Sequence, residues 1–150
     1  MLYSGVSKVV GVPAENIEIT DQIKDSFIAA VLSNKPFTFT DTIGDLVIKF
    51  CTPTLKEYEQ LSQLDDTTDP TYEDGLIVSC IKSIFKNNDV VYNKSDKSLL
   101  DRKAELSAIF SDTVVLPILI GKWFRFFKLY KTLCKEAVSP DFFEKTRNTG

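Results

Sequence analysis

The chain has 150 residues, a mass of 16.9 kDa and a formal net charge of −3 at pH 7. Its 43% hydrophobic and 26% charged residues are typical of a globular protein and exclude the disordered and fibrous classes. The chain has no histidine, which excludes catalytic centres and zinc sites that depend on an imidazole. Because 150 residues is about the size of one domain, we expect a single domain over residues 1–150.

The first predicted elements are an extended arm and a helix. Residues 1–19 mix Val, Gly and Pro and end in an alternating Ile-Glu-Ile, which predicts an arm that finishes in a short strand. Thr20 is a typical N-cap residue. Apolar residues then recur at helical spacing until Asn34 and Pro36, and these residues are Ile23, Phe27, Ile28, Val31 and Leu32.

The hydrophobic period then changes to two. Residues 37–40 and 46–50 alternate, and turn-forming residues that include Gly44 separate them, so we predict a β-hairpin. The core-facing residues of its second strand are expected to be Leu46, Ile48 and Phe50. The opposite face of that strand is expected to carry Val47, Lys49 and Cys51.

Two further helices are predicted after the hairpin. Thr54 and Glu57 are three residues apart, as the partners of a capping box are, and one side of the helix that they start gathers Leu55, Tyr58, Leu61 and Leu64. An acidic loop over residues 65–70 follows. Thr71 can cap the next helix, which we expect to end at Asn87 and Asn88 and to carry Leu76, Ile77, Cys80, Ile81, Ile84 and Phe85.

The second half of the chain begins with an edge strand predicted over residues 90–92. The helix predicted next carries Leu99, Leu106, Ile109 and Phe110. The last long helix, predicted from about residue 113 to 134, is different. Residues 113–135 hold five of the chain's 18 basic side chains and none of its 21 acidic ones.

This last helix is predicted to be amphipathic, with its aromatic residues in one stripe and its basic residues largely opposite. The stripe contains Trp123, Phe126, Phe127, Tyr130, Leu133 and Cys134. Pro117 is compatible with a first helical turn, so the helix is expected to begin near Leu116. Ser139 and Pro140 then start a short helix with Phe142 and Phe143.

Together these patterns predict an α+β fold that is mainly helical, with one β-hairpin followed by a packed set of four to five helices. Residues 1–19 are expected to form an extended N-terminal arm. Residues 139–150 are expected to form a C-terminal docking tail, because terminal segments with two adjacent Phe residues need contacts to be ordered.

The sequence contains no recognisable catalytic or cofactor motif. Neither GxxxxGK[ST] nor GxGxxG occurs, and Pro70 interrupts any EF-hand frame in the acids of residues 65–74. We therefore expect no catalytic residue, no cofactor and no metal. A carboxylate-based hydrolase remains an alternative, because two acids suffice for that chemistry.

The three cysteines, Cys51, Cys80 and Cys134, are odd in number and lack metal-ligand spacing, which favours reduced thiols in a reducing compartment. The N-terminal sequence lacks the basic and apolar regions of a secretion signal. The longest apolar run, over residues 114–121, is shorter than the roughly 20 residues that a membrane span needs. We expect neither export nor membrane insertion.

The segment from Ile23 to Leu64 carries a more specific pattern. An apolar helix ends in Val31-Leu32-Ser33-Asn34-Lys35-Pro36-Phe37, a hairpin closes on Leu46-Val47-Ile48-Lys49-Phe50, and Thr52-Pro53-Thr54-Leu55-Lys56-Glu57-Tyr58 follows. This order resembles small proteins of tailed bacteriophages, namely tail-assembly chaperones and the baseplate hub proteins of contractile-tailed phages. Cys51 stands where those proteins usually have a basic residue.

The resemblance implies a nonenzymatic protein of the virion tail or baseplate, assembled in the host cytoplasm as part of an oligomeric assembly. Its partners would be other tail or baseplate subunits. The alternative that it implies is a tail-assembly chaperone that binds the tape measure protein and is absent from the finished virion.

The basic aromatic helix is the candidate partner surface, because aromatic and Arg side chains dominate interface hot spots. The hypothesised interface residues are Trp123, Arg125, Phe126, Phe127, Lys128, Tyr130, Phe142 and Phe143. The alternative is that the aromatic residues fill the protein's own core. Membrane surfaces and nucleic acid are weaker alternatives, and an isoelectric point of about 5.0 opposes the latter, so we expect neither as a partner.

Overall fold

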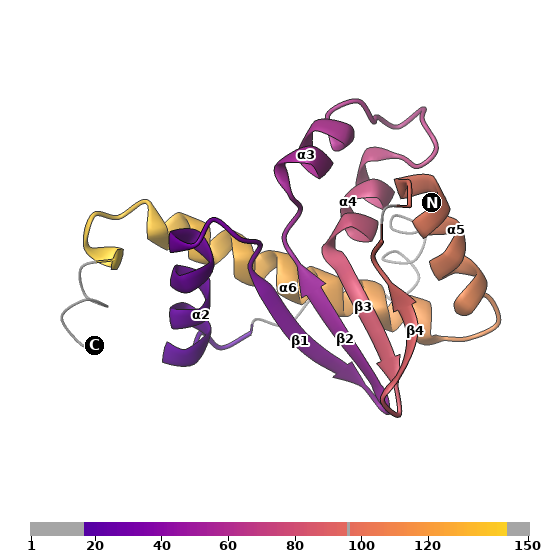
Figure 1. Ribbon diagram of the computed structural model, residues 1–150, viewed down its shortest axis with the longest axis horizontal. Helices are drawn as coiled ribbons and strands as arrows, with labels where there is room; N and C mark the ends of the chain where they lie inside the picture. The colour runs from indigo at the N-terminus through magenta and orange to yellow at the C-terminus, as the bar shows by residue number, and fades with distance from the viewer. Residues whose placement is uncertain (1–16, 96, 144–150) are drawn as a thin grey trace.

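The computed structural model describes residues 17–95 and 97–143, and Figure 1 shows how their helices and strands are arranged. In chain order these elements are α2 (Asp21–Leu32), β1 (Thr38–Ile43), β2 (Leu46–Cys51), α3 (Leu55–Leu61), α4 (Tyr72–Cys80), β3 (Ile81–Lys86), β4 (Asp89–Asn93), α5 (Leu99–Ile109) and α6 (Val115–Ala137). The four strands form one antiparallel sheet in the order β1-β2-β3-β4. None of the described helices is both long and apolar enough to cross a membrane.

The predicted fold class is wrong in its strand content and in its order of elements. It had one hairpin followed by helices, whereas a second hairpin, β3–β4, follows α4 and completes the sheet. The helix predicted across residues 72–85 ends at Cys80. The edge strand expected over residues 90–92 is present as β4.

A β-bulge explains why β3 has the spacing of a helix. Phe50 of β2 lies opposite Ile81, and its neighbour Lys49 lies opposite Ser83, so Lys82 is an extra residue. Ile81 and Ile84 therefore face the core together at a spacing of three, which is a helical spacing. This helical spacing is the reason why the predicted helix continues from α4 into β3.

The turn after β3 is a hairpin turn, although its two residues are also typical of a helix end. Asn87 and Asn88 have φ values of 50° and 71°, which are the left-handed conformations of a two-residue type I′ hairpin turn. Asn tolerates this region better than most residues with a side chain. The pair was interpreted as a helix end, although it joins two strands.

The first hairpin is confirmed. Residues 43 and 46 face each other across a two-residue turn in which Gly44 has a φ of 57°, a conformation that glycine adopts without strain. The predicted core-facing residues Leu46, Ile48 and Phe50 are all buried. Cys51 lies on the opposite face, as expected, but it is buried there as well.

The predicted helix starts are confirmed by their caps. The Thr20 side chain accepts a hydrogen bond from the backbone of Ile23, and Thr71 does the same for Asp74. Thr54 and Glu57 form the complete capping box. Residues 17–19 do not form the expected strand. The rest of the predicted arm, residues 1–16, lies outside the described residues.

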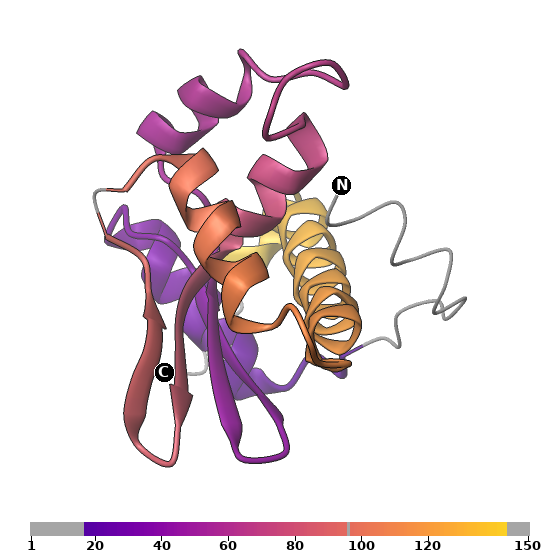
Figure 2. The same ribbon diagram turned by 90° about the vertical axis from the view of Figure 1, so that its right-hand side faces the viewer.

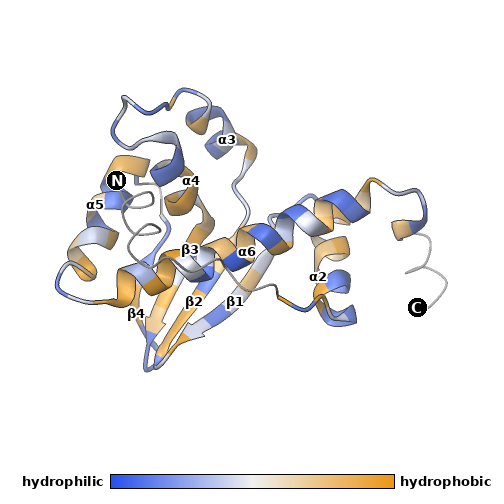
Figure 3. Cartoon of the chain, turned by 180° about the vertical axis from the view of Figure 1, so that it is seen from behind, coloured by the Kyte–Doolittle hydropathy of each residue, from blue (hydrophilic) through white to orange (hydrophobic). Residues whose placement is uncertain are grey.

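Helix α6 begins at Val115, close to the predicted start, and lies across one face of the sheet, as Figure 3 shows. Phe126 is fully buried there. Its ring stacks on those of Phe37, Phe39 and Phe50 at centroid distances of 6.0, 6.4 and 5.5 Å. Asp41 of β1 adds ion pairs to Lys122 and Arg125, which fix α6 along the sheet.

The sheet is covered on one side. Figure 2 shows α4, α5 and α6 gathered on the same side of the strands, and α4 packs against both α5 and α6. No described helix covers the opposite face, which is the face toward the viewer in Figure 1. An antiparallel sheet with one covered and one open face is expected to alternate apolar and polar residues, as β2 does up to Phe50.

Candidate functional site

The hypothesised interface residues fall into two groups. Trp123, Phe126 and Phe142 are only 4%, 0% and 5% exposed, and all three belong to the protein's own hydrophobic core. For these residues the alternative stated above, a role in the core, is the one that the structure supports. An amphipathic stripe predicts which side chains are buried, but it does not predict whether the protein's own core or a partner protein covers them.

The C-terminal segment contacts its own chain. The Phe142 ring packs edge-on against Phe27 of α2 at a centroid distance of 6.1 Å, and Lys24 Nζ lies 4.8 Å from the centroid of the same ring. Within residues 139–143 of the predicted docking tail, Phe142 therefore packs against α2 of the same chain. Residues 144–150 lie outside the described residues.

The remaining hypothesised residues are at least partly exposed. Arg125 is half-buried and engaged with Asp41 at 3.6 Å, whereas Lys128 is exposed and Phe127, Tyr130 and Phe143 are half-buried. Phe127 stacks on Trp123 at 5.1 Å, and Lys131 Nζ lies 5.2 Å from the Phe127 centroid. We call Phe127, Lys128, Tyr130 and Lys131 the α6 ridge.

The α6 ridge is anchored to α3 through its tyrosine. The Tyr130 side chain lies beside those of Tyr58 and Cys134. Burial raises the pKa of Tyr130, and the neighbouring Tyr58 and Cys134 raise it further, so its hydroxyl stays protonated at neutral pH. The ridge therefore presents one fixed aromatic ring, one cation–π pair and Lys128, which forms no ion pair with any residue that the structure describes.

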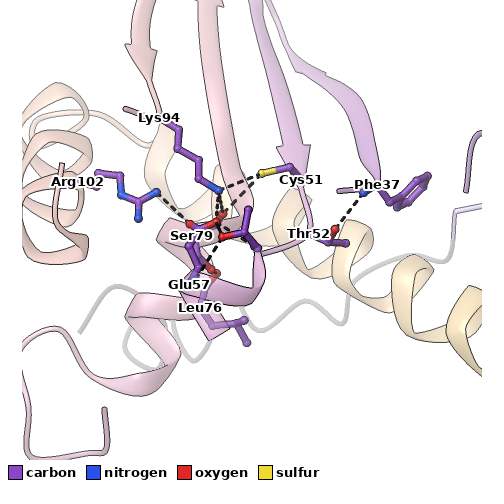
Figure 4. A network of polar contacts seen from close by, with 9 residues as sticks. Phe37, Cys51, Thr52, Glu57, Leu76, Ser79, Lys94 and Arg102 are labelled. Carbon is purple, nitrogen blue, oxygen red and sulfur yellow. Dashed lines mark hydrogen bonds and ion pairs between the residues drawn. The ribbon is translucent and has the colours of Figure 1, made fainter. Parts of the chain in front are cut away.

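A second polar arrangement lies where the first hairpin enters α3, and Figure 4 shows it. The carboxylate of Glu57 is 6% exposed and receives charged partners on both oxygens. Lys94 Nζ lies 2.5 Å from Oε1, and Arg102 Nη1 lies 3.3 Å from Oε2. We call Glu57, Lys94, Arg102, Cys51 and Ser79 the Glu57 network.

Glu57 reaches this position because it belongs to the capping box. Its Oε1 accepts hydrogen bonds from the backbone and the hydroxyl of Thr54, both at 3.1 Å, while its own backbone N–H donates to Thr54 Oγ1. The box fixes the carboxylate at the N-terminus of α3, where the helix dipole favours a negative charge.

Lys94 joins the two ends of the α3–α4 segment. Besides Glu57, its amine donates to the Ser79 carbonyl at 3.1 Å and lies 3.7 Å from Cys51 Sγ. Ser79 is in the last turn of α4, where carbonyls lack helical partners and the dipole favours a cation. One amine therefore binds the start of α3 and the end of α4.

The thiol of Cys51 is not an activated nucleophile. Burial raises its pKa, and the nearby Lys94 amine only partly opposes that effect. Its S–H donates to the Ser79 carbonyl at 3.6 Å. Burial also raises the pKa of Cys80 to about 12. Both groups are thiols at neutral pH, and the nucleophilic form of cysteine is the thiolate.

The carboxylate of Glu57 is ionised. Burial alone would raise its pKa, but the hydrogen bonds from Lys94 and Thr54 outweigh burial and lower it below the usual value. A general acid at pH 7 needs a raised pKa. The network is therefore one ionised carboxylate shared by two cations, and it holds α3, α4 and α5 together.

The acidic loop between α3 and α4 has local partners. Asp65 accepts hydrogen bonds from the side chain and backbone of Thr67, which lower its pKa. Lys103 Nζ lies 2.7 Å from Asp69 and 3.5 Å from the buried Asp74. Within residues 17–95 and 97–143, no group of three or more Cys, Asp or Glu side chains is arranged to hold a metal ion.

The sequence reading missed Lys94 and Arg102. They are 37 and 45 positions from Glu57 along the chain, so no local spacing connects them. The only local signal was the capping box, which identified Glu57 as a fixed carboxylate without indicating that it is buried.

The comparisons with known proteins give no further assignment: no family model, no curated protein and no solved structure matches the chain.

Proposed function

We propose that the chain is a nonenzymatic protein that acts through contacts with other proteins, in the tail or baseplate of a tailed bacteriophage. The assignment to phage tails comes from the resemblance of residues 23–64. The nonenzymatic part is favoured by the Glu57 network, whose single carboxylate is held by two cations and whose thiol is protonated.

The α6 ridge is the observation that carries the binding role. It combines a half-buried Phe127 and Tyr130 with Lys128 and Lys131 on a helix whose other side is anchored in the core. Rigid aromatic side chains beside basic ones lose little conformational entropy on binding, and such residues are enriched in interface hot spots. Tail and baseplate subunits are the partners that we propose for this ridge.

A co-expression experiment tests the proposal. The chain would be produced with the products of the neighbouring genes, and complexes would be isolated by size-exclusion chromatography. We expect co-elution with a tail or baseplate component. Replacing Lys128 and Lys131 with Glu should weaken the complex by at least about tenfold in Kd, because both charges on the ridge are reversed.

The matched control replaces Lys49 and Lys86 with Glu. Both are exposed lysines of the sheet, so the change in net charge is the same while the ridge is intact, and this variant should bind like the wild type. Failure of the wild-type chain to bind any tail component would overturn the proposal, and equal loss in both variants would remove the ridge from it.

Mass spectrometry of purified particles separates the two roles implied by the resemblance. A structural subunit is present in the finished virion. A chaperone binds the tape measure protein in the infected cell and is absent from the virion.

A further inference from the structure

Two adjoining surface cavities lie at the base of the first hairpin. One, of about 340 Å³, is lined by Lys35, Pro36, Thr38, Cys51, Lys82 and Lys94. The other, of about 310 Å³, is lined by Asn34, Lys35, Pro36, Leu55 and the residues from Thr52 to Thr54. Because Lys35 and Pro36 line both, the cavities lie on either side of one short segment. We call them together the lysine groove.

The lysine groove is positively charged in a chain whose net charge is negative. It has three lysines, and no described acidic residue lines either cavity. Lys94 forms an ion pair with Glu57. Among the described residues, no ion pair involves Lys35 or Lys82, and both side chains are exposed.

The other end of the groove is apolar. Leu55 is 76% exposed although it is the first residue of α3, and Pro36 and Pro53 line the same cavity. The prolines stiffen this wall, because their φ angles are fixed. The backbone is held from beneath by hydrogen bonds in both directions between Phe37 and Thr52, each of 3.0 Å, and these bonds are drawn in part in Figure 4.

We infer that the lysine groove binds a peptide segment of a partner protein that carries carboxylates beside aliphatic side chains. The carboxylates would lie against Lys35 and Lys82, and the aliphatic side chains against Leu55 and the two prolines. This inference rests on the proposed function, since it names the chemistry of one partner of that protein. It assigns a second contact surface, separate from the α6 ridge.

Charge complementarity and the apolar wall together select this occupant. A nucleic acid would match the lysines, but the described residues that line the groove include no aromatic side chain on which a base could stack. The Glu57 network also favours a peptide, because it fixes the floor of the groove before binding and so reduces the ordering cost for a flexible segment.

The experiment measures peptide binding directly. The probe is a fluorescein-labelled peptide with a block of glutamates beside a block of leucines, and the readout is fluorescence anisotropy. We expect saturable binding to the wild-type chain that weakens as NaCl rises from about 50 to about 300 mM, because exposed charges are screened. A peptide with Gln in place of each Glu should bind at least about tenfold more weakly.

Variants locate the site. Replacing Lys35 and Lys82 with Glu should weaken binding by at least about tenfold, and Leu55→Ser should weaken it by about threefold or more. The double variant Lys49→Glu/Lys86→Glu, whose lysines lie outside both the groove and the α6 ridge, is the matched control and should bind like the wild type. Circular dichroism and thermal melts establish that each variant is folded, and Lys35→Gln/Lys82→Gln provides a milder charge change.

Each outcome supports or overturns the inference. Loss confined to the groove variants, with amide shifts of Lys35, Thr38 and Lys82 in two-dimensional NMR, supports it. No binding of the acidic peptide by the wild type overturns it, as does equal binding by the groove variants. Tighter binding of a single-stranded oligothymidylate of the same net charge at these lysines overturns it in favour of nucleic acid.

The peptide experiment does not depend on any phage component. If the chain assembles with a tail component but ignores the peptide, the inference fails and the proposed function stands. If the peptide binds in the groove and no tail component binds, the proposed function fails.

Discussion

Two lysine–glutamate contacts in this protein have almost the same length and very different surroundings. Lys94 Nζ lies 2.5 Å from Glu57, and Lys97 Nζ lies 2.6 Å from Glu105. The side chains of the first pair are 19% and 7% exposed, and those of the second are 47% and 29% exposed. Burial therefore distinguishes the pairs, and distance does not.

The two contacts contribute differently to stability. Water and salt screen the exposed pair, so its two charges lose little when separated. The buried pair shares its carboxylate with Arg102, and a lost partner leaves a charge where solvent cannot compensate it. Substitutions at the two pairs should therefore have effects of different size.

The largest effect is expected for Glu57→Ala. It leaves Arg102 buried without its carboxylate and breaks the capping box, so the free energy of unfolding should fall by about 3–5 kcal/mol. Urea denaturation measures this loss. Glu105→Ala is the matched control, and a loss of similar size in both variants would contradict the role assigned to burial.

A triple variant sharpens the comparison. Glu57→Leu/Lys94→Met/Arg102→Met removes all three charges together, so no buried charge is left unmatched. We expect it to recover at least about 1 kcal/mol relative to Glu57→Leu alone, as judged by the same denaturation experiment. A triple variant less stable than the single one would mean that the network contributes through its geometry and not through charge matching.

The next effect depends on pH. The pKa of Glu57 is lower in the folded protein than its usual value, so its carboxylate stabilises the fold above the unfolded-state pKa. That contribution is lost as the pH falls through the folded-state pKa. Wild-type stability should drop below about pH 4, and the drop should be shallower in Glu57→Gln. Parallel curves for the two proteins, measured by thermal melts across this range, would exclude Glu57 as the titrating group.

The smallest effect is expected for the exposed pair. Lys97→Ala and Glu105→Ala should each change the free energy of unfolding by less than about 1 kcal/mol, and a double-mutant cycle should give a coupling energy of about 0.5 kcal/mol or less. Added salt should reduce that coupling further. A coupling above about 2 kcal/mol would place this pair in the same class as the buried one.

Sequence patterns predicted the parts of the fold that depend on local chemistry. The hairpin around Gly44 and the caps at Thr20 and Thr54 follow from residues within a few positions of one another. The second hairpin was missed because a bulge gives Ile81 and Ile84 a helical spacing. Its turn at Asn87 and Asn88 was the available signal against that interpretation.

The candidate surfaces were less predictable, for two reasons. An aromatic stripe predicts burial but not the burying partner, so Trp123 and Phe126 belong to the core while Phe127 and Tyr130 remain on the ridge. The lysine groove combines residues from before β1, from β3 and from just after β4, and only the folded sheet brings them together. No spacing in the sequence relates Lys35 to Lys82.

The way Lys94 joins the two ends of the α3–α4 segment affects how this chain can vary. The segment leaves the sheet after β2 and returns at β3, and its base is held at Glu57 and at the Ser79 carbonyl. Its far end, over residues 62–71, is outside that base. The entropic cost of closing a longer loop grows only with the logarithm of its length. Insertions at the tip should therefore lower the free energy of unfolding only slightly. This segment is a place where the protein can gain residues while its sheet stays the same.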